Sequence, residues 1–151
     1  MQTSQGTFTI TLDQKDSPNV TASFAALVRK RYFDGTIFHR IVPGFLIQGG
    51  DRSATGHGYP GYTVRDKPPA TTKYTAGVVA MAKTTVQPAG TAGSQFFIVT
   101  AANAGLTPDY AIVGAVVKGL AVVDRIGRLG DQGGEPTETV ELERATLRSS
   151  A

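Results

Sequence analysis

The sequence contains no cysteine, no tryptophan and only two histidines, His39 and His57. The absence of cysteine excludes a disulfide scaffold, a thiol nucleophile and every thiolate-bound zinc or iron–sulfur site. Two histidines are too few for a histidine-rich metal centre. We therefore predict that the protein works without a metal and without a cofactor.

Long apolar runs and charge clusters are also scarce. No apolar stretch approaches the ~20 residues of a membrane span, and the opening residues MQTSQGTF lack the apolar core of a secretory signal. We predict no membrane partner and a cytoplasmic location; the alternative is an exported or membrane-anchored domain whose leader is absent from this chain. The only tight basic cluster, Arg29-Lys30-Arg31, is interpreted as a solvated helix end rather than a phosphate-binding patch, which predicts no nucleic-acid partner.

What the chain does have is an ordinary globular composition and many turn residues. Its 151 residues favour one domain over 1–151, and 40% hydrophobic with 18% charged residues argues against disorder. Glycine and proline, with 18 and 8 residues, exceed the roughly 12% that they contribute to average proteins. This excess indicates many turns, and hence a mainly β protein.

Hydrophobic periodicity predicts short strands and two helices. Alternation over 6–12 indicates a strand, and Ser17-Pro18 begins a helix whose apolar positions recur at helical spacing until Asp34-Gly35. A second helix is predicted over 120–126, a last strand over 139–147 and a frayed tail over 148–151. Short apolar runs between them predict further strands at 37–42, 45–48, 78–82, 96–100 and 111–117. This order suggests a closed or nearly closed antiparallel barrel with helices over its ends.

The stretch 51–76 is irregular and rich in glycine, proline and threonine. Structureless loops longer than about 12–15 residues usually carry function. Residues 56–61 match G-x-G-x-x-G, but no helix follows them, so we interpret these glycines as turn residues rather than a dinucleotide fingerprint.

The densest segment, 38–51, reads FHRIVPGFLIQGGD and predicts a hairpin around Pro43-Gly44. A two-residue turn would put Arg40 and Gln48 on opposite faces. A three-residue loop instead pairs Arg40 with Gln48 on one face. Two-residue hairpin turns need a positive φ at their first position, which proline cannot adopt, so we predict the three-residue loop.

A second segment, GSQFFIV at 93–99, mixes polar and aromatic residues in the same way. If Phe96 enters the core, alternation leaves Gln95 and Phe97 outside it. A bare aromatic there is typical of a ligand pocket with a polar rim. From these residues alone, simple packing on the barrel surface remains an equal alternative.

The 38–51 segment, followed in order by GVVAMAK, GSQFF and LTPDYAIVG, makes the chain similar to the cyclophilin family of peptidyl-prolyl isomerases. The similarity extends from the first predicted strand to the last and is greatest to bacterial-looking members. It implies a mainly β fold, a closed eight-stranded antiparallel barrel capped by two α-helices. It also implies a site on the outer face, because the interior of so small a barrel is filled by side chains.

Carried over residue by residue, the resemblance makes Arg40 the catalytic residue of a peptidyl-prolyl cis-trans isomerase that assists protein folding. Apolar side chains would line a pocket for the proline ring: Phe45, Leu46, Phe97 and Leu106, with Tyr110 at the edge. Polar groups would bind the substrate backbone: the Gln48 amide and the main chain at Ala82 and Lys83, with Gln95 nearby. By strand alternation His39 points away from Arg40, and we interpret it as structural.

The chain departs from the family pattern at four positions. Leu46 stands where many members have methionine, Lys83 replaces an asparagine, and Tyr110 replaces a histidine. Gly105 stands where many members carry a tryptophan or phenylalanine that contributes to cyclosporin binding. We therefore expect isomerase activity on proline-containing peptides and folding polypeptides, weakened cyclosporin affinity, and a monomer as the default state.

Two other functions fit parts of the sequence. One is a module that binds proline-containing segments with little turnover. The other is a barrel that encloses an apolar small ligand, which the size of the barrel argues against. A pure binding module has no need of a guanidinium beside the imide nitrogen, so Arg40 discriminates the isomerase from the module.

Overall fold

The computed structural model describes residues 1–149, which hold twelve short strands and two helices. The strands are β1 (Gln2–Thr3), β2 (Gly6–Thr7), β3 (Thr9–Leu12), β4 (Thr36–Ile37), β5 (Arg40–Val42), β6 (Leu46–Gly49), β7 (Val64–Arg65), β8 (Val78–Met81), β9 (Thr91–Ala92), β10 (Phe96–Val99), β11 (Ile112–Lys118) and β12 (Glu141–Arg144). All pair antiparallel. They form a four-stranded sheet β2-β1-β12-β4, a six-stranded sheet β3-β11-β8-β10-β6-β5 and the pair β7-β9.

The predicted mainly β fold with two helices is confirmed, whereas closure into an eight-stranded barrel is not. Within the described residues the six-stranded sheet ends at β3 on one side and β5 on the other. Strands of two to seven residues, with register shifts in the pairings of β11 with β3 and β8, divide the hydrogen bonding among three sheets. Bulges of this kind bend strands and interrupt a ladder.

The first helix, α1 (Pro18–Arg29), begins with the predicted proline at its first turn. The Ser17 side chain makes no capping hydrogen bond. The backbone carbonyl of Ser17 instead accepts hydrogen bonds from the backbone N–H and the hydroxyl of Thr21. The helix ends at Arg29, before the predicted Gly35, and Arg31 takes a positive φ of 57° that stops it. The basic cluster is thus an exposed helix end, as predicted.

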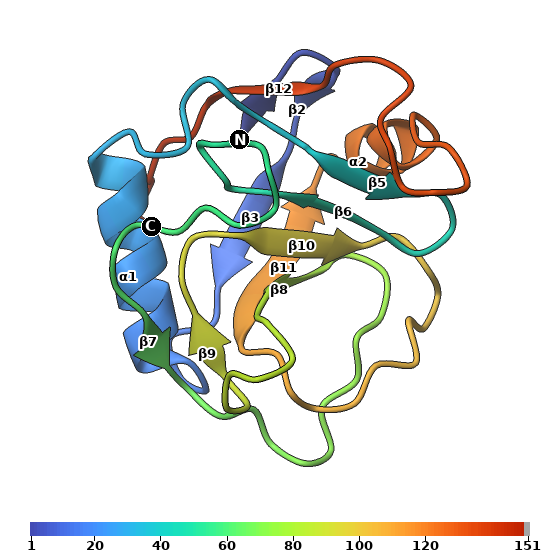
Figure 1. The fold of residues 1–151 in the computed structure, drawn as a ribbon. Coiled ribbons are helices and arrows are strands. Elements are labelled where there is room, and N and C mark those ends of the chain that lie inside the picture. Colours follow the sequence, from blue (N-terminus) through green and yellow to red (C-terminus); the bar gives the residue numbers. More distant parts are fainter. Residues whose placement is uncertain (150–151) are drawn as a thin grey trace.

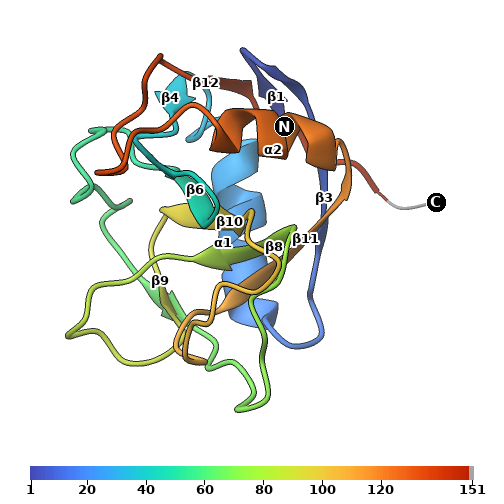
Figure 2. The same ribbon diagram turned by 90° about the vertical axis from the view of Figure 1, so that its right-hand side faces the viewer.

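The second helix, α2 (Leu120–Gly127), matches its prediction to within one residue. The two helices lie on opposite sides of the strands (Figures 1 and 2). The first packs against β7 and β11, and the second against β5 and β6. The hairpin that carries Arg40 and Gln48 therefore rests on α2. No helix within residues 1–149 combines the length and the apolar character that crossing a membrane requires.

Three predicted strands differ from the observed ones. The strand predicted over 37–42 divides into β4 and β5, which belong to different sheets. The strand predicted over 6–12 divides at Phe8 into β2 and β3, which belong to different sheets. The last strand is Glu141–Arg144 rather than 139–147. The irregular stretch 51–76 contains only the two residues of β7 as strand. Of the predicted tail, 150–151 lie outside the described residues.

Apolar side chains form two clusters on the two faces of β10. Phe96 and Ile98 join the main core, together with Phe8, Phe24 and other buried residues. Phe97 and Val99 point to the other face and join a smaller cluster. Alternation along one strand therefore supplies both the core and the floor of the site described next.

Candidate active site

The β5–β6 hairpin has the register that the three-residue loop predicted. Arg40 pairs with Gln48 and Val42 with Leu46. The backbone N–H of Phe45 donates to the Val42 carbonyl at 3.0 Å, and Gly44 has φ 74°. The Arg40 guanidinium donates to Gln48 Oε1 at 3.4 Å, so the cation and the amide lie side by side.

A chain of side-chain hydrogen bonds extends from this pair. Gln48 Nε2 donates to Gln95 Oε1 at 3.0 Å, and Gln95 Nε2 donates to the Gly58 carbonyl at 2.9 Å. The contact between Gln48 and Gln95 forms because β10 pairs with β6. Phe97 lies opposite Gln48, and Gln95 directly precedes β10. The chain links the exposed Arg40 to the irregular 51–76 loop.

Phe97 forms an apolar floor beside this polar chain. Phe97 is only 3% exposed because the Tyr74 and Tyr110 rings pack around it, at centroid distances of 6.4 and 5.4 Å. Leu46 is also 3% exposed. The expectation of a bare aromatic at Phe97 is therefore wrong: the ring is packed from the sides by the protein's own aromatics. Phe45, Leu106 and Tyr110 stay half-buried around it.

An open cavity of about 590 Å³ lies over this floor. Nine of the ten predicted site residues line it: Arg40, Phe45, Leu46, Gln48, Ala82, Lys83, Phe97, Leu106 and Tyr110. The tenth, Gln95, lines a neighbouring cavity of about 330 Å³ that shares Gln48, Ala82 and Lys83 with the first. The structure thus brings the predicted residues together, while their individual roles stay predictions.

Lys83 and Ala82 form one wall of both cavities. The Lys83 ammonium lies 5.5 Å from the centre of the Tyr110 ring and donates to the Thr84 carbonyl at 3.3 Å. The Ala82 backbone N–H donates to the Gln95 carbonyl at 2.9 Å, which ties this wall to β10. A cation over the face of an aromatic ring is attracted by its quadrupole.

His39 lines the cavity together with Arg40, although alternation predicted that it points away from it; its structural role stays a prediction. Alternation does not apply to it because β5 begins only at Arg40. Its Nδ1 is buried without a hydrogen-bond partner within residues 1–149. Burial, partly offset by the Asp51 carboxylate, lowers the pKa of His39 below its ordinary value, so the ring is neutral at pH 7.

Two loops contribute to the cavity: the first belongs to the stretch 51–76, whose length indicated a function, and the second was missed by sequence reasoning. Residues 54–56 and 133–135 both line it. Gly134 lies against the Arg40 side chain and its carbonyl accepts the Ile41 N–H at 2.9 Å. No motif marks residues 133–135, which are more than 90 positions from Arg40 in sequence, so only the fold reveals their proximity.

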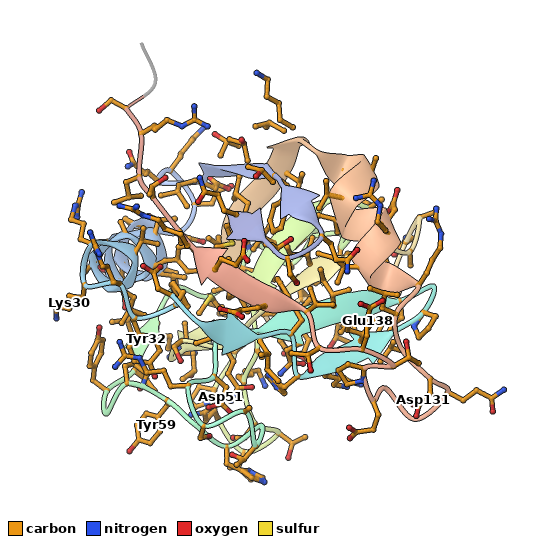
Figure 3. The ribbon with its side chains drawn as sticks, turned by 90° about the horizontal axis from the view of Figure 1, so that it is seen from above. Lys30, Tyr32, Asp51, Tyr59, Asp131 and Glu138 are labelled. Atoms are coloured by element: carbon orange, nitrogen blue, oxygen red, sulfur yellow. The ribbon has the colours of Figure 1, made fainter. Side chains whose placement is uncertain are left out.

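Asp51, two residues after the end of β6, holds the first of these loops. Its Oδ1 accepts the backbone N–H and the hydroxyl of Ser53, at 2.8 and 2.7 Å, and its Oδ2 accepts the N–H groups of Gly56 and Gly58, at 2.8 and 3.2 Å. Figure 3 shows Asp51 on the same side of the molecule as Tyr59, well away from Asp131. The side chain is 1% exposed. One carboxylate therefore organises the turn.

These hydrogen bonds predict a specific acid dependence of stability. Burial alone would raise the pKa of Asp51, but the bonds from Ser53, Gly58 and Gly56 outweigh it and lower the pKa to about 2, from 3.8. A depressed folded-state pKa stabilises the fold above the unfolded pKa, and this contribution is lost as the pH falls toward 2. We expect the difference in free energy of unfolding between wild type and Asp51→Asn to shrink between about pH 5 and pH 2. Urea titrations at each pH measure it; a constant difference would contradict the assignment.

Tyr74 is a second supporting residue without a sequence signal. It is fully buried, and burial raises the pKa of its phenol, which stays protonated. Its hydroxyl donates to the Tyr110 carbonyl at 2.7 Å and accepts the Tyr110 N–H at 3.0 Å. The Tyr74 ring packs edge to face on Tyr110 as well, with centroids 5.9 Å apart. It therefore fixes both backbone and ring of a residue that lines the cavity.

Tyr74→Phe is expected to remove both bonds while keeping the ring. The Tyr110 backbone groups lose their partner in a part-buried setting, which costs about 1–3 kcal/mol of unfolding free energy. We also expect weaker peptide binding, since Tyr110 loses its fixed position. Urea unfolding and a peptide titration measure the two effects. Tyr62→Phe, at a tyrosine 41% exposed, is the control and should change neither.

Fold and site together define a mainly β domain with an open cavity, in which a cation and an amide lie beside an apolar floor. The family model described as cyclophilin type peptidyl-prolyl cis-trans isomerase/CLD matches residues 1–147. The chain is 37% identical over 152 residues to peptidyl-prolyl cis-trans isomerase-like 1 of Neurospora crassa, covering 97% of this chain and 91% of the relative. It is 35% identical over 150 residues to the human protein of that name, covering 96% and 89%.

Among solved structures, a cyclophilin type peptidyl-prolyl cis-trans isomerase of Cryptosporidium parvum, crystallised in the presence of the dipeptide Ala-Pro, superposes with a TM-score of 0.89. It shares 29% identity, and the match covers 99% of this chain and 98% of that one. The chain therefore belongs to the cyclophilin family of peptidyl-prolyl cis-trans isomerases. It is an enzyme that interconverts the cis and trans forms of X-Pro peptide bonds.

Proposed function

We propose that Arg40 stabilises the twisted imide of a bound X-Pro segment while the apolar floor holds the proline ring. The observation that carries the proposal is the pairing of Arg40 with Gln48 directly beside Leu46 and Phe97. One cavity thus offers a permanent cation, an amide and a nonpolar surface.

The reaction needs only rotation. Twisting a peptide bond breaks amide resonance and costs about 18–20 kcal/mol, although both isomers of X-Pro are populated. In the twisted state the proline nitrogen regains a lone pair. A donor aimed at that nitrogen binds the twisted form more strongly than the planar form, and this difference lowers the barrier.

Arginine suits this role because its guanidinium stays charged at every relevant pH and offers several N–H donors. In this cavity Arg40 already gives one N–H to Gln48 Oε1, which leaves others for a substrate. The ring of the substrate, seated on Phe97 and Leu106, displaces water and strengthens the electrostatic contact. Gln48 and the main chain at Ala82 and Lys83 would hold the other side of the bond, so that rotation is confined to one half.

The substrates in this proposal are proline-containing peptides and folding polypeptides. Support comes from the Cryptosporidium parvum relative, which was crystallised in the presence of Ala-Pro. We further propose that the protein is a monomer. We also propose that it binds cyclosporin weakly, because Gly105 carries no ring beside Leu106 and is exposed to solvent. Isothermal titration with cyclosporin, and the mass in solution, test these two points. The cytoplasmic location stays a prediction.

The test of the proposed site is an NMR titration with a short Ala-Pro peptide. We expect the largest backbone shifts at Leu46, Phe97 and Leu106, and exchange cross-peaks between the cis and trans peptide at substoichiometric protein. Shifts confined to β7 and β9 would place the peptide elsewhere and overturn the proposal. Shifts at the cavity without catalysed exchange would favour a binding module over an enzyme.

A further inference from the structure

The hydrogen-bond chain behind Arg40 has a direction, and Gly58 sets it. A glutamine amide has one acceptor oxygen and one donor NH₂. The Gly58 carbonyl can accept only, so it requires the NH₂ of Gln95, at 2.9 Å. Gln95 then presents its oxygen to the Gln48 NH₂ at 3.0 Å, which leaves the Gln48 oxygen for Arg40 at 3.4 Å. The reverse order would turn an NH₂ toward the guanidinium.

The position of Gly58 depends in turn on Asp51. The Gly58 N–H donates to Asp51 Oδ2, while its carbonyl faces Gln95. The backbone of residue 58 lies close to Asp51, since a Cβ there would overlap the Asp51 carboxylate. All four hydrogen bonds to this buried carboxylate come from neutral groups of residues 53, 56 and 58. A buried acceptor with this many donors fixes the turn around it.

We propose that Asp51 is a positioning residue of the isomerase, which orients the Gln48 oxygen toward Arg40 through Gly58 and Gln95. The proposal rests on the proposed role of Arg40. It assigns to Asp51 no contact with substrate: the carboxylate does not line the cavity, whereas residues 54–56 of the turn that it holds do. Its effect is to keep the guanidinium in one place during rotation of the bound imide.

Asp51→Asn tests the proposal with little change in shape. The amide must turn its NH₂ toward the N–H groups of either Ser53 or of Gly56 and Gly58, so the turn loses acceptors. We expect kcat to fall about 10-fold, with KM within about twofold, because misplacing a catalytic group affects rate far more than binding. We also expect the Nε2 amide signals of Gln48 and Gln95 to shift in the nitrogen–proton spectrum of the substrate-free protein.

A double-mutant cycle separates positioning from general damage. Gln95→Leu breaks the chain, so adding Asp51→Asn to it is expected to lower kcat no further. Asp66→Asn is the matched control. Asp66 also accepts a backbone N–H, that of Val20 at 2.6 Å, but it belongs to the contact of α1 with residues 65–66. The Asp66→Asn substitution should lower the free energy of unfolding and leave kcat and both glutamine signals unchanged.

The outcomes distinguish this inference from the proposed function. Unchanged glutamine signals in Asp51→Asn, or an equal loss of kcat with and without Gln95, would overturn the role of Asp51. The glutamine signals are recorded without substrate, so they test the role of Asp51 independently of catalysis. A fully active Arg40→Ala variant would instead remove the proposed function of Arg40 and leave this test standing. If Asp51→Asn does not fold, Ser53→Ala removes one of the four bonds. It should shift the Gln95 signal in a smaller step, and no shift would equally overturn the inference.

Discussion

Replacing Arg40 with alanine is expected to lower kcat by about 10²–10³-fold, the loss found when one donor aimed at developing charge is removed. Affinity for an Ala-Pro peptide should stay within about threefold, because the apolar floor under the proline ring is untouched. Arg40 is exposed and its side chain packs no core, so the fold should persist. NMR exchange spectroscopy at saturating peptide measures kcat directly and needs no coupled protease.

The matched control is Arg52→Ala. Arg52 is also exposed, lies 4.1 Å over the Tyr32 ring, and is not among the residues that line the cavity. It removes the same charge from the molecule and should leave kcat unchanged. Equal exchange rates for wild type and Arg40→Ala would contradict the mechanism; equal losses in both arginine variants would attribute the effect to net charge rather than to position.

The largest expected effect on stability is that of Phe96→Ala. The ring is fully buried and packs edge to face with Phe24, Phe33 and Phe38, at centroid distances of 5.7, 5.7 and 6.1 Å. Deleting a buried phenylalanine removes its transfer free energy and leaves a cavity, at a cost of about 3–5 kcal/mol. Urea unfolding should show a lower midpoint at an unchanged slope.

Val117→Ala is the control for this variant. Val117 is 59% exposed on β11, so its truncation should change the free energy of unfolding by less than about 0.5 kcal/mol. A loss below about 1 kcal/mol for Phe96→Ala would mean that the four rings do not form a closely packed core.

Local patterns predicted the parts of this structure that local chemistry determines. Proline cannot adopt the positive φ of a two-residue hairpin turn, and this one fact places Arg40 opposite Gln48. Alternation along β10 correctly sends Phe96 to the core and Phe97 to the other face. Pro18 begins the first helix because a first-turn residue needs no N–H.

What local patterns did not reveal are contacts between distant segments. The burial of Phe97 depends on Tyr74 and Tyr110, whose packing against it no spacing encodes. Gly134 reaches Arg40 from the far end of the chain. His39 lines the cavity although alternation predicted that it points away from Arg40, because the predicted strand 37–42 is interrupted at 38–39 and β5 begins only at Arg40. Barrel closure requires every register around the sheet, and such long-range pairing is not contained in any single strand.

The irregular stretch 51–76 is a second case in which sequence patterns did not predict the structure. Its length indicated a function, but its composition did not indicate that a single carboxylate, Asp51, organises it. The signal available was the aspartate directly after Gly49-Gly50, followed by small residues whose free N–H groups can turn inward. Only the fold brings Gly58 to Gln95, and so connects that turn to Arg40.

A crystal structure of the protein with a bound Xaa-Pro peptide tests the central claim most directly. The account predicts the pyrrolidine ring seated on Phe97 and Leu106, with an Arg40 N–H directed to the nitrogen side of the imide and the Gln48 amide on the peptide backbone. A guanidinium turned away from the imide, or a proline ring bound outside this cavity, would contradict it.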